Sequence, residues 1–156
     1  MMNFDEQYAC YTSGEKKINE LYHRIAAQNG ISDSVLSIFL CLYDETQVHT
    51  QNTIAIRMGV PKQTINSAIN KLMKDGYIYL EQMSIARNKK QIMLTKNGKQ
   101  FCDRYIAPIV IAEENAFNRL SVEEQEAYLS IGIKFNQFMV EEMSELISKK
   151  QGDDNE

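Results

Sequence analysis

The chain has 156 residues, of which 44% are hydrophobic and 24% charged, and its net charge at pH 7 is −4. These values are ordinary for a soluble globular protein, and the length suits one domain that buries a sizeable core. Seven glycines and two prolines leave little scope for β-turns, so we expect a mainly α fold with a small β-hairpin.

Membrane insertion and secretion are not indicated. The longest apolar run, "VLSIFLCLY" from Val35 to Tyr43, has the length of a buried helix and is too short to cross a bilayer. The first residues, "MMNFDEQYACYTSGEKK", have neither the basic nor the apolar region of a secretory signal. We therefore expect a cytoplasmic protein that makes no membrane contact.

The first two predicted helices precede residue 46. Residues 4–28 form the first helix, and "NGIS" (29–32) ends it because Asn and Gly accept a left-handed conformation. Ser32 or Asp33 then caps a second, largely apolar helix that runs to about Glu45. The apolar positions of the first helix are Tyr8, Tyr11, Ile18, Leu21, Tyr22 and Ile25.

The next two helices are short and closely spaced. Thr50 caps "QNTIAIRM", which Gly59 ends, and Pro61 opens a helix that Gly76 ends. In this fourth helix the apolar residues recur at the i, i+3, i+4, i+7 spacing that directs one side towards a core. They are Ile65, Ala68, Ile69 and Leu72.

After Gly76 the apolar period changes from helical to β-type. "YIYLEQ" (77–82) and "KQIMLT" (90–95) predict a hairpin with a charged tip, which makes residues 46–95 a winged helix-turn-helix lobe. Thr95 caps a long helix from 96 to about 119, and we expect Pro108 to kink it. "SVEE" (121–124) is a capping box for a last helix that runs to about 147, before a frayed polar tail.

The long flanking helices predict self-association. We interpret residues 1–156 as a single domain in which the helices 4–28 and 96–147 lie outside the lobe. Their apolar positions exceed what so small a lobe can bury, so we expect them to pair with a second copy of the chain in a homodimer. In the last helix these positions are Tyr128, Ile131, Phe135, Phe138, Met139, Met143 and Leu146.

The charge is unevenly distributed along the chain. From Arg57 to Arg104 there are ten Lys or Arg and three Asp or Glu, whereas the rest of the chain has seven and eighteen. A basic middle between acidic ends is typical of a nucleic-acid contact, although chance clustering on a solvated surface is the alternative.

The outer side of the 61–76 helix has the chemistry of a DNA-reading surface. Amides can bond bidentately to adenine and hydroxyls suit either base, while lysines at both ends can meet phosphates. An ordinary solvated helix face is the alternative, but such faces usually mix Glu with Lys, and this one has no carboxylate before Asp75. The predicted DNA-binding residues of this helix are Lys62, Gln63, Thr64, Asn66, Ser67, Asn70, Lys71 and Lys74.

The hairpin tip adds three cations, Arg87, Lys89 and Lys90. A cationic tip beside a recognition helix can reach the adjacent minor groove, whose potential attracts Arg and Lys. A solvated turn without function is the alternative.

These segments resemble the MarR family of bacterial transcriptional regulators over most of the chain. The likeness lies in "IAIRMGVPKQTINSAINKLMKDGYI" and in "IMLTKNGKQF", whose Leu94, Thr95 and Gly98 match the family's Leu-Thr-x-x-Gly step. It implies a homodimer on a palindromic double-stranded DNA operator, usually a repressor that a small ligand releases. One departure stands in the wing, where the family often has Asp-x-Arg and this chain has Ala86-Arg87-Asn88, so we expect Arg87 and Lys89 to substitute.

Members of the family commonly bind phenolic ligands between the dimer helices and the DNA-binding lobe. Tyr22, His23, Tyr43 and His49 lie in segments that could line such a pocket, and a packing or surface role is the alternative for each. The two histidines lack ligand-like spacing, so we expect no metal site and no cofactor. No phosphate-binding Gly loop, nucleophile elbow or paired catalytic motif is present, so an enzyme is not indicated.

Two other interpretations remain open. Three cysteines, Cys10, Cys41 and Cys102, are too few and too far apart for a disulfide framework, and Cys41 lies in an apolar run that suits an inert thiol. Cys10, beside Tyr8 and Tyr11, could make the protein a redox-switched repressor. Alternatively, the winged lobe could be a protein–protein adaptor that does not bind DNA.

Overall fold

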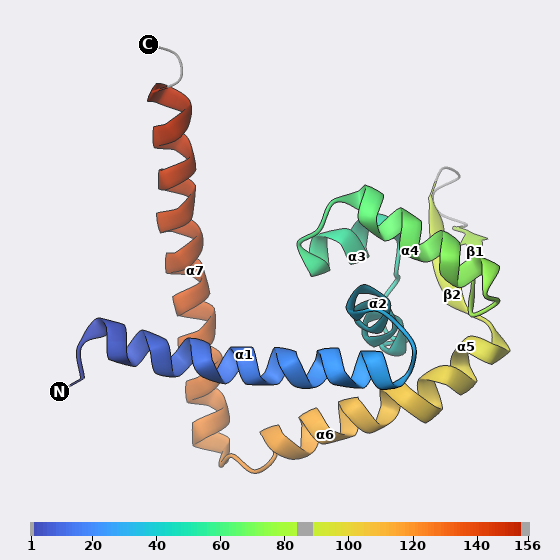
Figure 1. Cartoon of the computed structure of the whole chain (residues 1–156), viewed down its shortest axis with the longest axis horizontal. Coiled ribbons are helices and arrows are strands. Elements are labelled where there is room, and N and C mark those ends of the chain that lie inside the picture. The colour runs from blue at the N-terminus through green and yellow to red at the C-terminus, as the bar shows by residue number, and fades with distance from the viewer. Residues whose placement is uncertain (1, 84–88, 154–156) are drawn as a thin grey trace. The chain divides into compact units, whose positions relative to one another are not determined.

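The computed structural model describes residues 2–83 and 89–153 (Figure 1). Its fold is mainly α with one antiparallel hairpin, as predicted. The chain divides into two compact units, Met1–Val110 and Ile111–Glu156, each of which is described by itself. Whether the two act as one domain stays a prediction.

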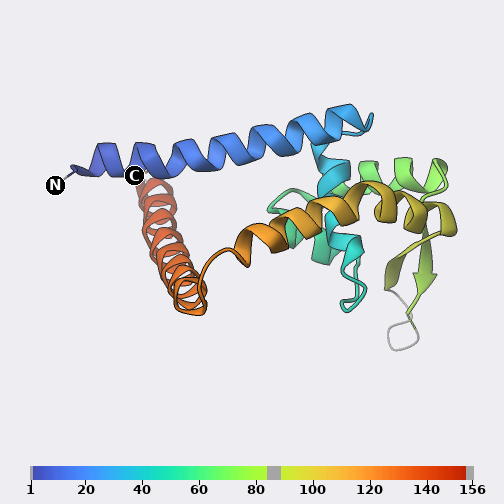
Figure 2. The ribbon, with the colours of Figure 1, turned by 90° about the horizontal axis from the view of Figure 1, so that it is seen from below.

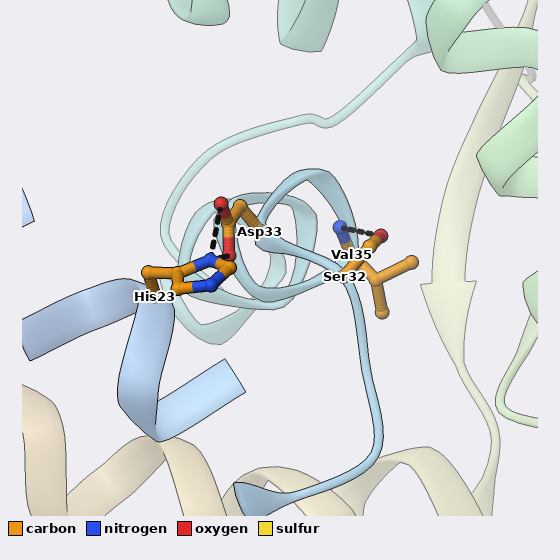
Figure 3. A network of polar contacts seen from close by, with 4 residues as sticks. All are labelled: His23, Ser32, Asp33 and Val35. Carbon is orange, nitrogen blue, oxygen red and sulfur yellow. Dashed lines mark hydrogen bonds and ion pairs between the residues drawn. The ribbon is translucent and has the colours of Figure 1, made fainter. Parts of the chain in front are cut away.

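The first unit contains the four helices that the apolar spacing predicts: α1 (Phe4–Gln28), α2 (Asp33–Tyr43), α3 (Gln51–Met58) and α4 (Lys62–Lys74). The predicted caps are confirmed at Ser32, whose hydroxyl accepts the Val35 N–H at 3.3 Å (Figure 3), and at Thr50. Two ends differ from the predictions. α2 stops at Tyr43, and Asp75 is the C-cap of α4, followed by Gly76 in the left-handed conformation.

The helix α2 is the centre of this unit (Figures 1 and 2), because α1, α3, α4, β2 and the turn after α5 all contact it. Its mean composition is the most apolar of the four helices, and most of its side chains are buried. From α4, Ile65, Ile69 and Leu72 complete the core as the i, i+3, i+4, i+7 spacing predicts, and Ala68 lies half-buried beside them. The α4 helix therefore has one buried side and one exposed side.

The hairpin consists of β1 (Ile78–Gln82) and β2 (Lys90–Leu94). Its register pairs Ile78 with Leu94 and Gln82 with Lys90, and each strand is one residue shorter than the run that predicts it. On the other edge of β2, the Ile92 N–H donates to the His49 carbonyl at 2.7 Å, so the segment before α3 anchors the hairpin.

The helix that follows the hairpin departs from the prediction of one kinked α-helix. It consists of α5 (Lys96–Phe101), a π-helical turn (Cys102–Ile106) and α6 (Ala107–Phe117). In the π-helical turn the Ala107 N–H donates to the Cys102 carbonyl, five residues back. Pro108 explains the position of this turn, because it has no N–H and its ring would clash with the carbonyl four residues earlier. The distortion therefore lies one turn before Pro108.

The second unit is built on α7 (Val122–Asp153). The predicted capping box is present, since the Ser121 hydroxyl accepts the Glu124 N–H at 3.3 Å and the Glu124 carboxylate accepts the Ser121 N–H at 2.8 Å. The helix continues beyond Ile147 to Asp153. The prediction of a frayed tail from residue 149 was therefore wrong for residues 149–153, which are helical. Lys and Gln, which follow Ser148, are good helix formers.

Candidate nucleic-acid interface

The predicted DNA-binding residues of α4 share its exposed side, which we call the polar face of α4. On the opposite side, Ile65, Ile69 and Leu72 are at most 2% exposed, so the buried and exposed sides of α4 are distinct. No acidic residue occurs between Lys62 and Lys74, so nothing on this face would repel a phosphate backbone. The polar face comprises Lys62, Gln63, Thr64, Asn66, Ser67, Asn70, Lys71 and Lys74.

The first turn of α4 presents backbone donors as well as side chains. Its N-cap is Pro61, which makes no side-chain capping bond. The N–H groups of Lys62 and Gln63 therefore lack an intrahelical partner, and such groups together with the helix dipole favour an anion. Lys71 and Lys74 occupy the last turn, where a cation complements the dipole.

Of the two hydroxyls on the polar face, those of Thr64 and Ser67, the second forms a hydrogen bond within α4. The Ser67 hydroxyl donates to the Gln63 carbonyl at 3.3 Å, within the same helix. Its proton is thereby held, and its lone pairs are what it offers to a partner. Ser67 can therefore accept a hydrogen bond from a base more readily than it can donate one.

A groove of about 690 Å³ separates the start of α3 from the hairpin. We call it the wing groove. Three lysines stand on its walls: Lys62 from α4, and Lys89 and Lys90 from the hairpin. Lys89 and Lys90 are exposed as predicted, whereas Arg87 lies outside the described residues. The remaining lining residues are Val48, Thr50, Gln51, Asn52, Thr53, Leu80 and Met83.

The first turn of α3 also contributes to this groove, although none of its residues was predicted to bind DNA. Its side chains Gln51 and Asn52 line the wing groove, and the Gln51 Nε2 donates to the Asn66 Oδ1 on α4 at 3.2 Å. The amides of the "QN" pair directly after the Thr50 cap are the signal that could have indicated this position.

The Leu-Thr-x-x-Gly step fixes the base of the hairpin. The Thr95 hydroxyl donates to the Gly76 carbonyl at 2.7 Å and accepts the Gly98 N–H at 3.1 Å, so it caps α5 and closes the strand pair together. Gly98 is required by space, since a Cβ there would stand 2.0 Å from the Tyr77 carbonyl oxygen. The motif therefore lets α5 pack directly against the start of β1.

His49 supports the same hairpin from the loop before α3. It is 8% exposed, and its Nε2–H donates to the Asp44 carbonyl at 2.7 Å. Asp44 in turn accepts hydrogen bonds from the hydroxyl and N–H of Thr46, and these bonds hold the pKa of its carboxyl below the usual value. The same loop contacts the hairpin, because the His49 carbonyl accepts the Ile92 N–H.

The four candidate ligand-binding residues are not brought together. Tyr22 packs on the core, and the exposed His23 Nδ1 lies 3.0 Å from the Asp33 carboxylate at the start of α2 (Figure 3). Tyr43 and His49 lie at and beyond its other end, roughly 15 Å away along the helix. A ligand pocket built from all four stays a prediction.

The cysteines differ in environment. Cys10 is exposed on α1, whereas Cys41 and Cys102 are buried. Burial raises the pKa of the Cys41 thiol, and burial together with the nearby Asp103 raises the pKa of the Cys102 thiol to about 12. Since the thiolate is the reactive form, burial lowers the reactivity of both of these thiols.

Among the described residues, no group of three or more His, Cys, Asp or Glu stands close enough together to hold a metal ion. No single helix in this part of the chain combines the length and the apolarity of a membrane span, although the bent pair of α1 and α2 together has both.

The arrangement of α3, α4 and the hairpin places the chain among the winged helix-turn-helix proteins, here with long additional helices. The MarR family model matches residues 29–82, which include α2, α3, α4 and β1. A curated relative, the HTH-type transcriptional repressor YetL of Bacillus subtilis (strain 168), is 27% identical over 121 residues, or 74% of this chain and 70% of the relative. The resemblance to the MarR family that the sequence predicts is confirmed by these matches.

Solved structures agree with the fold. The MarR family regulator NMB1585 from Neisseria meningitidis superposes with a TM-score of 0.73 at 19% identity, over 92% of this chain and 99% of that one. The S. aureus MepR–DNA complex gives a TM-score of 0.65 at 18% identity, over 89% of this chain and 99% of that one. The overall architecture is therefore that of MarR regulators.

Proposed function

We propose that this chain is a cytoplasmic transcriptional regulator, and not an enzyme, which binds a near-palindromic DNA operator as a homodimer and acts as a repressor. The observation that carries the proposal is the polar face of α4, which is exposed, rich in amides and without an acid. The repressor name of the curated relative and the DNA in the MepR complex support the same role.

The side chains of the polar face divide into two tasks. Gln63 and Asn70 are long enough and polar enough to bond to base edges, and an amide can satisfy both polar groups of adenine in the major groove. Lys71 and Lys74, in the last turn, are suited to phosphates on either side of that groove. Base contacts give sequence preference, and phosphate contacts give affinity that falls as salt rises.

The wing groove supplies a place for one DNA strand. Its cations are Lys62, from the first turn of α4, and Lys89 and Lys90, from the hairpin. The uncapped first turn of α4 stands at one wall and adds two N–H donors. A phosphate backbone laid along this groove would bring Lys89 and Lys90 close to the neighbouring minor groove.

The homodimer is supported by α7. Its apolar side chains lie on an arc of roughly 220° of the helix circumference at 100° per residue, about twice the arc that packing on one neighbour requires. These side chains are largely exposed in the single chain, with Ile131 at 67% and Ile133 at 70%. On α1, Phe4, Tyr8, Tyr11 and Ile18 are exposed at coiled-coil spacing. A second copy supplies the missing neighbours.

A twofold dimer sets the form of the operator. Two copies of α4 related by a twofold axis read two inverted half-sites, and such half-sites lie about one helical turn apart, roughly 34 Å. We therefore expect a near-palindrome rather than a single short element.

A gel shift tests the proposal. The full chain is titrated against the DNA upstream of its own gene and against a scrambled duplex of the same length and composition. We expect a shift of the upstream fragment at a concentration at least about 1,000-fold below that for the scrambled duplex, with a steep loss as salt rises. No shift of either duplex at low salt would reject DNA binding and favour the protein–protein adaptor.

Release from DNA by a small aromatic ligand completes the proposed role. His23 lies beside Asp33 at the start of α2 and Tyr43 lies at its other end, so a ligand pocket at either end would involve only part of the set. Simple phenolic acids should raise the melting temperature and weaken the gel shift if such a pocket forms. No effect of these compounds at millimolar concentration would remove the ligand from the proposal.

The redox-switched repressor has its own test. Cys10 is the exposed thiol among three, and the buried Cys41 and Cys102 have raised pKa values. If oxidation regulates the protein, peroxide abolishes the gel shift and Cys10→Ser preserves it. An unchanged shift after peroxide treatment would reject this alternative.

A further inference from the structure

His49 links two segments of the first unit, through its side chain and through its main chain. Its Nε2 lies 2.7 Å from the Asp44 carbonyl at the end of α2, and a carbonyl only accepts, so the ring donates this bond. The His49 carbonyl in turn accepts the Ile92 N–H of β2, also at 2.7 Å. The residue is 8% exposed, and losing a buried hydrogen bond is costly, so both bonds are strongly favoured. One residue thus connects the end of α2 to β2.

This link lies beside the wing groove but outside its lining. Val48 and Thr50, the neighbours of His49 in the sequence, both line the groove, whereas His49 itself does not. Thr50 is the N-cap of α3, so the bond between the His49 carbonyl and Ile92 fixes how far the start of α3 stands from β2. A change of the His49 ring would therefore remove no side chain from the groove, yet it would act on the bond that fixes the width of the groove.

Two of the three groove lysines depend on the position of β2. Lys90 is the first residue of β2, two residues before Ile92, and Lys89 precedes it. Because β1 pairs with β2 along its whole length, the hairpin moves as a unit, and the Ile92 bond holds its β2 edge to the segment before α3. Lys62 belongs to α4, which packs on α3. The spacing between Lys62 and the hairpin lysines therefore depends on His49.

We propose that His49 is a positioning residue that holds Lys89 and Lys90 at the spacing from Lys62 that one DNA strand requires. This inference rests on the proposed function. Attraction between a cation and a phosphate falls with distance, and salt screens it within about 10 Å, so displaced lysines release fewer counterions. A hairpin that is loosely held also loses more freedom when DNA orders it. The role of His49 is indirect, because its ring acts through the Asp44 bond and not through a contact with DNA.

Three substitutions separate this role from a general effect of residue 49. His49→Gln keeps an N–H donor at the same number of bonds from Cα as the histidine Nε2, so it should bind DNA as the wild type does. His49→Met has a similar length but no donor, so the Asp44 carbonyl loses its partner and the hairpin lysines lose their spacing. His49→Asn is one carbon shorter than His49→Gln, so its amide does not reach the Asp44 carbonyl, and it should behave as His49→Met does.

The experiment measures the affinity of the full chain and its variants for a random duplex at several salt concentrations. The slope of log K against log salt counts phosphate contacts, at about 0.9 for each. Lys89→Ala combined with Lys90→Ala gives the share of these lysines, which is up to about 3.6 for the four of them in a dimer. We expect His49→Met to lower the slope by at least about half of this share. In the lysine double variant, His49→Met should lower it no further.

Two controls distinguish positioning from a loss of stability. Ile106→Val removes one methyl group from a fully buried side chain in the π-helical turn, so it should lower the melting temperature and leave the slope unchanged. Amide exchange followed by NMR reports the bond to β2 directly. The Ile92 N–H should exchange faster in His49→Met than in His49→Gln. The Thr95 N–H, which donates to the Tyr77 carbonyl, should exchange at the same rate in both.

The outcomes separate the inference from the proposed function. If His49→Met does not fold at the assay temperature, His49→Asn carries the same comparison, and failure of both to fold would show that residue 49 supports the fold as a whole and would overturn the inference. A wild-type slope in folded His49→Met, or an equally reduced slope in His49→Gln, would overturn the inference and leave the proposed function intact. No binding of the wild-type chain to any duplex at low salt would overturn the proposed function, and the inference with it.

Discussion

The winged lobe and the α7 helix use apolar residues in opposite ways. In the unit Met1–Val110, which contains the lobe, Ile38, Phe39, Ile54 and Ile106 are at most 1% exposed, and a single chain completes this core. In α7, the longest helix of the chain, nearly all of the apolar side chains are exposed. Fully burying one such side chain contributes about 1.5–3 kcal/mol. Packing of α7 against another surface would therefore add to the stability of the protein.

The two regions therefore have different roles. The lobe is a self-sufficient support that presents the polar face of α4, and its hydrogen bonds at Thr95 and His49 hold the hairpin beside that face. The α7 helix contributes little to that support and much to association. The predictions below test each side of this division.

The largest effect should come from charging the exposed arc of α7. Ile131→Lys or Ile133→Lys places an uncompensated cation in the proposed dimer interface. Because the dimer has twofold symmetry, the interface contains two such cations, and each weakens dimerisation by roughly 3–5 kcal/mol. Sedimentation equilibrium at micromolar concentration should then change from the mass of a dimer to that of a monomer.

Gln137→Lys is the matched control. Gln137 lies on the same helix but outside the apolar arc, where its amide donates to the Glu141 carboxylate at 3.0 Å. A lysine there should leave the dimer intact. If all three lysine variants remain dimeric, the exposed arc of α7 is not the interface.

Within the lobe, Gly98→Ala should be the most destabilising small change. The new methyl group would stand 2.0 Å from the Tyr77 carbonyl oxygen, so α5 must move away from β1. We expect a loss of at least about 2 kcal/mol in the free energy of unfolding, measured by urea denaturation at one fixed protein concentration.

Gly14→Ala provides the contrast. A Cβ at Gly14 meets no atom within 4 Å, and replacing a helical glycine by alanine stabilises by about 1 kcal/mol. Equal effects of the two substitutions would contradict the close packing of α5 on β1.

The smallest effect should be a pH-dependent one at Asp44. Because the Thr46 bonds lower the pKa of this carboxyl in the folded state, the unfolded state binds the proton more readily. The stabilisation is therefore present above the unfolded pKa and is lost as pH falls through the folded pKa. Asp44→Asn should lower the melting temperature slightly at about pH 7 and leave it unchanged at about pH 2. A difference of the same size at both values would exclude this carboxylate as the cause.

Much of the fold followed from local sequence signals. The i, i+3, i+4 spacing at Ile65, Ile69 and Leu72 predicted the buried side of α4, and the period change after Gly76 predicted the hairpin. Caps at Ser32, Thr50 and Ser121 were equally local, because each depends on a hydrogen bond within three residues. Signals of this kind can be found without knowing the tertiary structure.

The features that were missed depend on contacts between distant segments or on local competition. The Gln51–Asn66 bond joins residues from two helices, and no periodicity indicates it. The π-helical turn before Pro108 was predicted only as a kink, because a proline can be accommodated by bending or by widening the preceding turn. The separation of His23 from Tyr43 by the length of α2 also required the tertiary structure, because the contact with Asp33 places His23.

The most direct test of DNA reading by α4 compares Asn70→Ala with Lys74→Ala on operator DNA and on random duplexes at one salt concentration. We expect Asn70→Ala to lose about 1–3 kcal/mol of binding free energy on the operator and almost nothing on random DNA. Lys74→Ala should weaken both by similar amounts, because a phosphate contact is independent of sequence. Equal losses on operator and random DNA for Asn70→Ala would contradict base reading by the polar face of α4.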